Sequence, residues 1–175
     1  MRQRGRTMSG WKLAGLLASV GLWGCGESNS LSGSVEELFS LEVSRVEVLR
    51  NAEALQVSYY RNNGLDVDLV ARVTVATEGI DLRPDSKVNL AGNTPSGVAR
   101  TTVVHLAAGE PARVFALVDK GDLELDEGGG IGQPTRGDFS MSFQRGDGYG
   151  AGRSLEGRFS SVALDAGFGP DLPPE

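Results

Sequence analysis

The clearest pattern in the chain is an alternation of apolar and polar residues with period two, which is typical of β-strands. It is strictest in residues 55–60 and again in residues 66–75, where Val67, Leu69 and every second residue to position 75 are apolar. Asn62-Asn63-Gly64 lies between these runs, and Asn and Gly accept the positive φ of a tight turn. The sequence therefore predicts a β-hairpin over residues 55–75.

Shorter runs predict further strands. The expected strands are 41–49 with a bulge near Ser44-Arg45, a short edge strand at 87–91, 99–107, a central strand at 113–118 that is apolar on both faces, 122–126, 137–143 and 155–159. Phe139, Met141 and Phe143 are predicted to face inward. The unit Gly-x-Phe occurs at 137–139 and again at 157–159, which indicates a closing hairpin around a Gly-rich loop.

These strands imply an all-β fold. Eight or nine strands in one domain, residues 37–166, favour a single antiparallel β-sandwich, with an up-and-down β-barrel as the alternative. Ser34-Val35-Glu36-Glu37 matches a capping box and predicts one helical turn through Phe39. Residues 167–175 contain three prolines and are predicted to form a disordered tail.

The first 25 residues have a different composition. Four cations and no acid precede an apolar run at 13–22, which is much shorter than the roughly 20 residues that span a bilayer. This combination is typical of a secretory signal. The run ends in Leu22-Trp23-Gly24-Cys25, which resembles the lipobox of bacterial lipoproteins, although Trp23 stands where a small or aliphatic residue is usual.

The resemblance implies a signal peptide at 1–24, cleavage after Gly24 and acylation of Cys25. Residues 25–36 would then be a flexible, lipid-anchored tether. Gly26 follows the cysteine in place of an aspartate that retains such proteins on the inner membrane, so the resemblance implies an outer-membrane location in the cell envelope. The Gly-x-Phe ending is similar to that of uncharacterised lipoproteins with β-rich domains.

Cleavage would make the chain more acidic. Four of the 17 Lys and Arg precede Cys25 and all 23 Asp and Glu follow it, so the formal net charge would change from −6 to −10. Nucleic acid binding requires a basic face, so a chain with this acidic charge is not expected to bind nucleic acid. The expected partners are the membrane, through the lipid on Cys25, and a protein of the envelope.

The scarcity of cysteine and histidine argues against several kinds of catalytic and metal site. Cys25 is the only cysteine and His105 the only histidine. With Cys25 acylated, the domain has no thiol for a nucleophile, disulfide or zinc site. His105 is interpreted as a strand histidine on the more polar face. The sequence thus predicts a non-catalytic binding or structural domain without a cofactor; the alternatives are a small-ligand carrier with a barrel cavity and a hydrolase that uses paired carboxylates.

One acidic stretch is a candidate cation site. Asp119, Asp122, Asp126 and Glu127 lie next to glycines that expose backbone carbonyls, and calcium takes several such oxygen ligands. The alternative, which the alternation with Leu123 and Leu125 favours, is a solvated acidic strand. Two Arg-Gly-Asp tripeptides, 136–138 and 145–147, are interpreted as turns at the ends of a strand.

Overall fold

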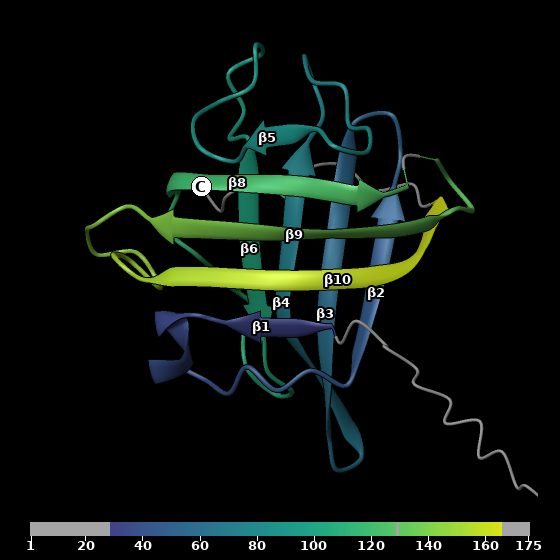
Figure 1. Cartoon of the computed structure of the whole chain (residues 1–175). Coiled ribbons are helices and arrows are strands. Elements are labelled where there is room, and N and C mark those ends of the chain that lie inside the picture. The colour runs from purple at the N-terminus through teal and green to yellow at the C-terminus, as the bar shows by residue number, and fades with distance from the viewer. Residues whose placement is uncertain (1–28, 129, 166–175) are drawn as a thin grey trace, which may run out of the picture.

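The computed structural model describes residues 29–128 and 130–165 (Figure 1). The predicted signal peptide, Cys25 and the tail at 167–175 lie outside these residues. The elements in chain order are β1 (Ser30–Ser32), a 3-10 turn η1 (Ser34–Glu37), β2 (Arg45–Arg50), β3 (Ala54–Asn63), β4 (Asp66–Ala76), β5 (Lys87–Asn89), β6 (Thr101–Leu106), β7 (Arg113–Val114), β8 (Val118–Glu127), β9 (Pro134–Phe143) and β10 (Ser154–Asp165). Within the described ranges, no helix is long and apolar enough to cross a membrane.

The strands form one strongly curled sheet that folds over itself as a half-barrel. Its hydrogen-bonded order is β5-β8-β9-β10-β2-β3-β4-β6-β7, and β1 pairs with β10. In Figure 1, β8, β9 and β10 run across the front, while β2, β3, β4 and β6 run steeply across them behind. The predicted all-β class is therefore confirmed, in a form between the sandwich and the barrel.

β10 joins the two layers. Residues 154–162 pair antiparallel with β9, and residues 163–165 pair parallel with β2. A long strand that changes partners in this way lets one sheet cover both sides of a single core. The other pairings between described strands are antiparallel, as predicted.

The core lies between the two layers. Tyr59 of β3 is fully buried, and its ring meets Phe139 of β9 edge-on at 6.1 Å. The Tyr59 hydroxyl donates a hydrogen bond to the carbonyl of Arg158 across the layers, at 3.2 Å. Burial raises the pKa of Tyr59, so the phenol stays neutral and can keep this bond. The residues predicted to face inward on β9 are buried with it.

The Gly-x-Phe repeat has a structural explanation. The two units pair antiparallel with each other, so that Gly137 faces Phe159 and Gly157 faces Phe139 across the strands. A Cβ on Gly157 would lie 2.5 Å from Cζ of Phe139, and thus each glycine leaves the room that the opposite ring occupies. The sequence echo is therefore a reciprocal packing of ring against glycine in the core.

Two predicted strands differ in the structure. Residues 113–118 are not a central strand, because β7 is only Arg113–Val114 at the end of the sheet order. The chain passes here from one layer to the other, which buries Phe115 and leaves Leu117 46% exposed. The strand predicted at 41–49 is β2, which starts at Arg45, and the bulge lies instead in the β3–β4 pairing, between Tyr59 and Tyr60.

The start of the domain also differs from the prediction. Ser30–Ser32 pair with β10, and Val35 is fully buried, so the ordered domain begins before residue 37. The turn expected after Ser34 is present, but without a capping box. The Ser34 hydroxyl instead accepts a hydrogen bond from the backbone N–H of Ser154 at 2.9 Å, which fixes η1 against β10.

Candidate functional site

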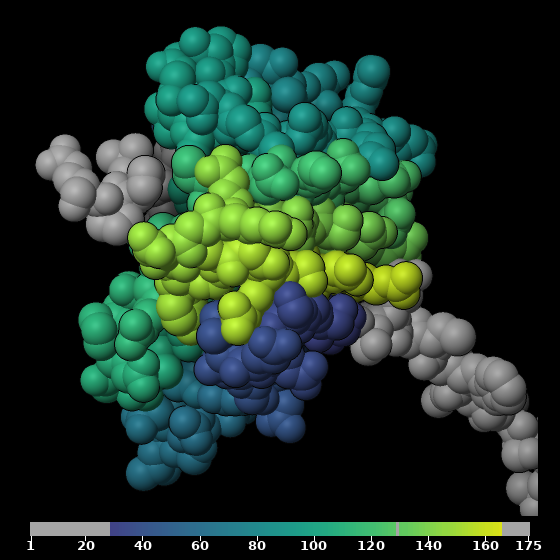
Figure 2. All heavy atoms as spheres, turned by 90° about the vertical axis from the view of Figure 1, so that its left-hand side faces the viewer, coloured from purple at the N-terminus to yellow at the C-terminus, as the bar shows by residue number. Residues whose placement is uncertain are grey.

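A cavity of about 300 Å³ opens at the end of the half-barrel where β6 finishes. We call it the aromatic pocket. Figure 2 views this side of the molecule, where the purple segment around η1 and the green loop after β6 come together. The lining side chains are Leu38, Phe39, Arg61, His105, Ala107, Glu110, Arg113 and Tyr149. They come from four separate parts of the chain.

His105 forms the floor of the aromatic pocket. It lies two residues after Val103 on β6 and therefore on the same, inner side of the strand, and it is only 6% exposed. The prediction that His105 occupies the more polar face is wrong for this reason. Its Nδ1 lies 2.9 Å from the carbonyl oxygen of Val70, which can only accept, so Nδ1 carries the hydrogen.

Three rings make a continuous wall. Phe39 stacks on His105 with a centroid distance of 3.9 Å and an interplanar angle of 17°. Tyr149 is nearly parallel to both rings and 6.5 Å from each of them. Equal distances to two stacked rings place Tyr149 beside the stack and not on top of it. Phe115 supports Tyr149 from the core with an edge contact at 5.0 Å.

Two arginines complete the aromatic pocket. The guanidinium carbon of Arg113 lies 5.5 Å from the ring centroid of Tyr149, within the range of a cation–π contact. It pairs with the carboxylate of Glu110 at 4.0 Å, and both side chains are about half exposed. Such a pair contributes little and is easily exchanged for another anion. Arg61 of β3 is better fixed, because it is bound to Asp68.

Asp68 connects the β3–β4 hairpin to the 107–112 loop at this end of the molecule. It is 1% exposed and accepts hydrogen bonds from Arg61 at 2.6 Å, Asn63 at 3.3 Å and the backbone N–H of Ala108 at 2.9 Å. The Ala108 bond first, and the Arg61 guanidinium second, hold the pKa of this carboxyl below its usual range. Asp68 alternates with the apolar Val67 and Leu69, so the sequence pattern predicts a polar, solvent-facing position; the structure buries Asp68 because the 107–112 loop folds over it.

The acidic residues of the candidate cation site remain apart from the aromatic pocket. Asp122 lies 3.2 Å from Lys87, and Asp126 lies 3.6 Å from Arg136, so each has a cationic neighbour. Asp119 and Glu127 are exposed at the two ends of β8. In the part of the chain that the structure describes, no three His, Cys, Asp or Glu side chains are grouped as metal ligands. Gly24 and Cys25 lie outside it.

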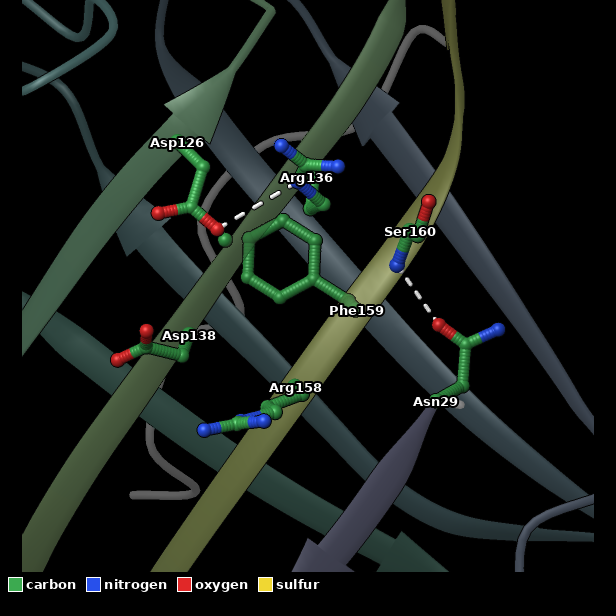
Figure 3. Close-up of a pocket in the computed structure, with 8 residues that line it drawn as sticks. Asn29, Asp126, Arg136, Asp138, Arg158, Phe159 and Ser160 are labelled. Carbon is green, nitrogen blue, oxygen red and sulfur yellow. Dashed lines mark hydrogen bonds and ion pairs between the residues drawn. The ribbon is translucent and has the colours of Figure 1, made fainter. Parts of the chain in front are cut away.

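A second hollow of about 230 Å³ lies on the outer face of β8–β10 (Figure 3). Its charges face one another. Asp126 pairs with Arg136, and Asp138 stands opposite Arg158 in the strand register. Asn29 closes one side by accepting a hydrogen bond from the N–H of Ser160 at 2.7 Å. The lining of this hollow includes one ring, that of Phe159, whereas three rings line the aromatic pocket.

The two Arg-Gly-Asp tripeptides have different settings. Residues 136–138 lie within β9, with Arg136 and Asp138 on its outer side, and not in a strand-end turn as predicted. Residues 145–147 lie in the loop between β9 and β10.

Sequence reasoning did not identify Phe39, Arg61, Arg113 or Tyr149. The one local signal in the sequence is Tyr149, because an aromatic residue inside a Gly-rich loop is not part of the alternating pattern that predicts core residues. The others meet only through the fold. Comparison with known proteins gives no further guide, since neither a family model, nor a curated protein, nor a solved structure matches this chain.

Proposed function

We propose that this chain is a lipid-anchored protein of the bacterial cell envelope, held in the outer membrane through Cys25, whose β-domain binds a ligand without catalysis. The signal-like first 24 residues and the lipobox-like Leu22–Cys25 support the location. The aromatic pocket is the observation that supports binding, because three rings and two arginines from separate parts of the chain line one cavity.

The surroundings of His105 favour binding over hydrolysis. A catalytic triad needs a carboxylate on one ring nitrogen and a nucleophile on the other. Here Nδ1 is bound to the backbone carbonyl of Val70. Glu110 is the one carboxylate among the described residues that line the aromatic pocket, so a pair of carboxyl groups for glycoside hydrolysis is not assembled there.

The packing favours an open pocket over an internal carrier cavity. The space between the layers is filled by large side chains, among them Tyr59, Leu55 and Phe159, each less than 2% exposed. An interior ligand would have to displace these side chains. A ligand in the aromatic pocket would contact side chains that are already partly exposed.

The anchor is tested by mass spectrometry of membrane-extracted protein. The expected N-terminal peptide begins at Cys25 and carries lipid-sized additional mass, while a Cys25→Ser variant stays unprocessed or is released from the membrane. An unmodified peptide that begins at Met1 in the mature pool would overturn the location.

The binding role is tested by hydrogen–deuterium exchange of the full chain. The exchange in native envelope vesicles is compared with that of the purified chain in detergent. We expect slower exchange in residues 105–115 and 145–150 when the envelope is present, and no change in residues 130–133, which connect β8 to β9 and line no part of the aromatic pocket. Equal exchange in both samples would contradict binding at this site.

A further inference from the structure

We propose that the aromatic pocket takes a small planar aromatic carboxylate, with the carboxylate between Arg61 and Arg113 and the ring against Phe39 and Tyr149. This inference rests on the proposed binding function and names its ligand class. It is argued from the charge, the free hydrogen-bonding groups and the size of the aromatic pocket.

The charge selects an anion. The chain is acidic overall, with a formal net charge of −6, yet two guanidinium groups line one small cavity. Arg61 has five N–H donors, and the bond to Asp68 uses Nη2. Among the described residues, Arg113 forms one ion pair, with Glu110 at 4.0 Å. Arginine recognises carboxylates by paired hydrogen bonds, so both side chains can turn donors toward a carboxylate ligand.

The uncharged side chains of the aromatic pocket favour a ligand that contains an aromatic ring. The wall of Phe39, His105 and Tyr149 offers ring faces and edges, which attract a further ring beyond the area that it buries. Burial raises the pKa of Tyr149, so its phenol is neutral and its hydroxyl can donate to an anion. His105 adds Nε2, for which the described residues provide no hydrogen-bond partner.

The size limits the ligand. A cavity of about 300 Å³ is at the lower end of the range for small-molecule sites. It corresponds to roughly ten water molecules at about 30 Å³ each, or one or two fused rings with a short acid arm. A free inorganic anion would leave the aromatic wall unused.

Isothermal titration calorimetry on the full chain in detergent tests this assignment. The probes are indole-3-acetate, its neutral analogue indole-3-acetamide, and acetate, which lacks the ring. We expect saturable binding of indole-3-acetate, at least about tenfold weaker binding of the amide, and no measurable binding of acetate below about 10 mM. Equal binding of acid and amide, or no binding of the acid, would overturn the ligand class.

Two arginine variants locate the bound anion. Arg113→Gln should weaken the binding of indole-3-acetate at least about tenfold, because a charge-assisted contact is lost. Arg45→Gln is the matched control, since Arg45 also lies over a tyrosine ring, that of Tyr60 at 4.4 Å, and pairs with Glu47, but lines no part of this cavity. An equal loss in both variants would contradict the assignment. If the acid fails to bind while the envelope still protects residues 105–115 from exchange, the ligand class falls and the proposed function stands.

Discussion

Asp68 is the residue on which this end of the molecule depends most. One buried carboxylate joins the β3–β4 hairpin, through Arg61 and Asn63, to the 107–112 loop, through Ala108. A buried charge is tolerated when its partners satisfy it, and removing one member leaves the others unpaired. The position of Arg61 in the aromatic pocket is therefore a consequence of Asp68.

We expect Asp68→Asn to lower the free energy of unfolding by about 2 kcal/mol or more, because three hydrogen bonds lose their ionised acceptor and the Arg61 charge loses its partner. Urea unfolding monitored by circular dichroism measures this change. Glu47→Gln is the control, since Glu47 pairs with Arg45 at the surface, with the two side chains 34% and 56% exposed, and should cost less than about 1 kcal/mol. Equal losses in the two variants would show that Asp68 stabilises the fold no more than a surface ion pair does.

The same residue gives a pH dependence. The pKa of Asp68 is lower in the folded chain than in the unfolded chain, so ionised Asp68 stabilises the fold above about pH 4, the value of a free aspartate. This contribution is lost as the pH falls through the lowered, folded-state pKa. The stability difference between wild type and Asp68→Asn should therefore shrink below about pH 4. A stability difference that is constant from neutral pH down to pH 3 would contradict stabilisation by the ionised carboxylate of Asp68.

At the scale of elements, the pairing of β9 with β10 sets the shape of the core. Glycine within a strand usually destabilises it by roughly 0.5–1 kcal/mol relative to alanine. Gly157 is the reverse case, because a Cβ there would lie 2.5 Å from Phe139 and 2.9 Å from the hydroxyl oxygen of Tyr59. The missing side chain is what allows both rings to occupy the core.

Gly157→Ala should thus destabilise the domain, by about 1–3 kcal/mol as expected for an overpacked core. Ser160→Ala, on the outer side of the same strand, is the control and should change the stability by less than about 0.5 kcal/mol. Thermal and urea unfolding of the two variants decide the matter. A stabilised Gly157→Ala variant would mean that Phe139 and Tyr59 move aside without cost.

We expect no specific calcium binding on the outer face of β8. Asp122 and Asp126 each have a cationic neighbour, Lys87 and Arg136 respectively. Millimolar calcium should therefore raise the melting temperature no more than sodium chloride of equal ionic strength, since a specific site would add a further stabilisation that grows with ligand concentration. A calcium-specific rise that Asp122→Asn with Asp126→Asn abolishes would establish a site here.

The alternation of residues predicts much of this fold but little of its site. It gives the hairpin of β3 and β4 and the inward rings of β9, because a half-buried strand alternates by its geometry. It fails at 113–118, where the apolar residues belong to a crossing between layers. Tyr149 and Phe39 meet His105 through loop closure and the docking of η1, for which no local pattern exists.

At the scale of the whole molecule, the short tether has a geometric consequence for the proposed anchor. β1 begins at Ser30, and five residues from Cys25 can span at most roughly 18 Å at about 3.6 Å per residue. If Cys25 carries the lipid, the edge of the domain formed by β1 stays close to the bilayer surface. A longer tether, ending at residue 36 as the sequence suggests, would have allowed more freedom.

Photo-crosslinking in intact cells tests the central claim that the aromatic pocket binds a component of the envelope. A benzophenone amino acid replaces Leu38, which lines the aromatic pocket and is 39% exposed, or Leu117, which is 46% exposed but lies outside it. We expect an adduct of defined mass from position 38 that Arg113→Gln abolishes, and none from position 117. The same adduct from both positions, or no adduct from position 38, would contradict binding at this site, whereas an adduct from position 38 that persists in Arg113→Gln would contradict only the assignment of an anionic ligand.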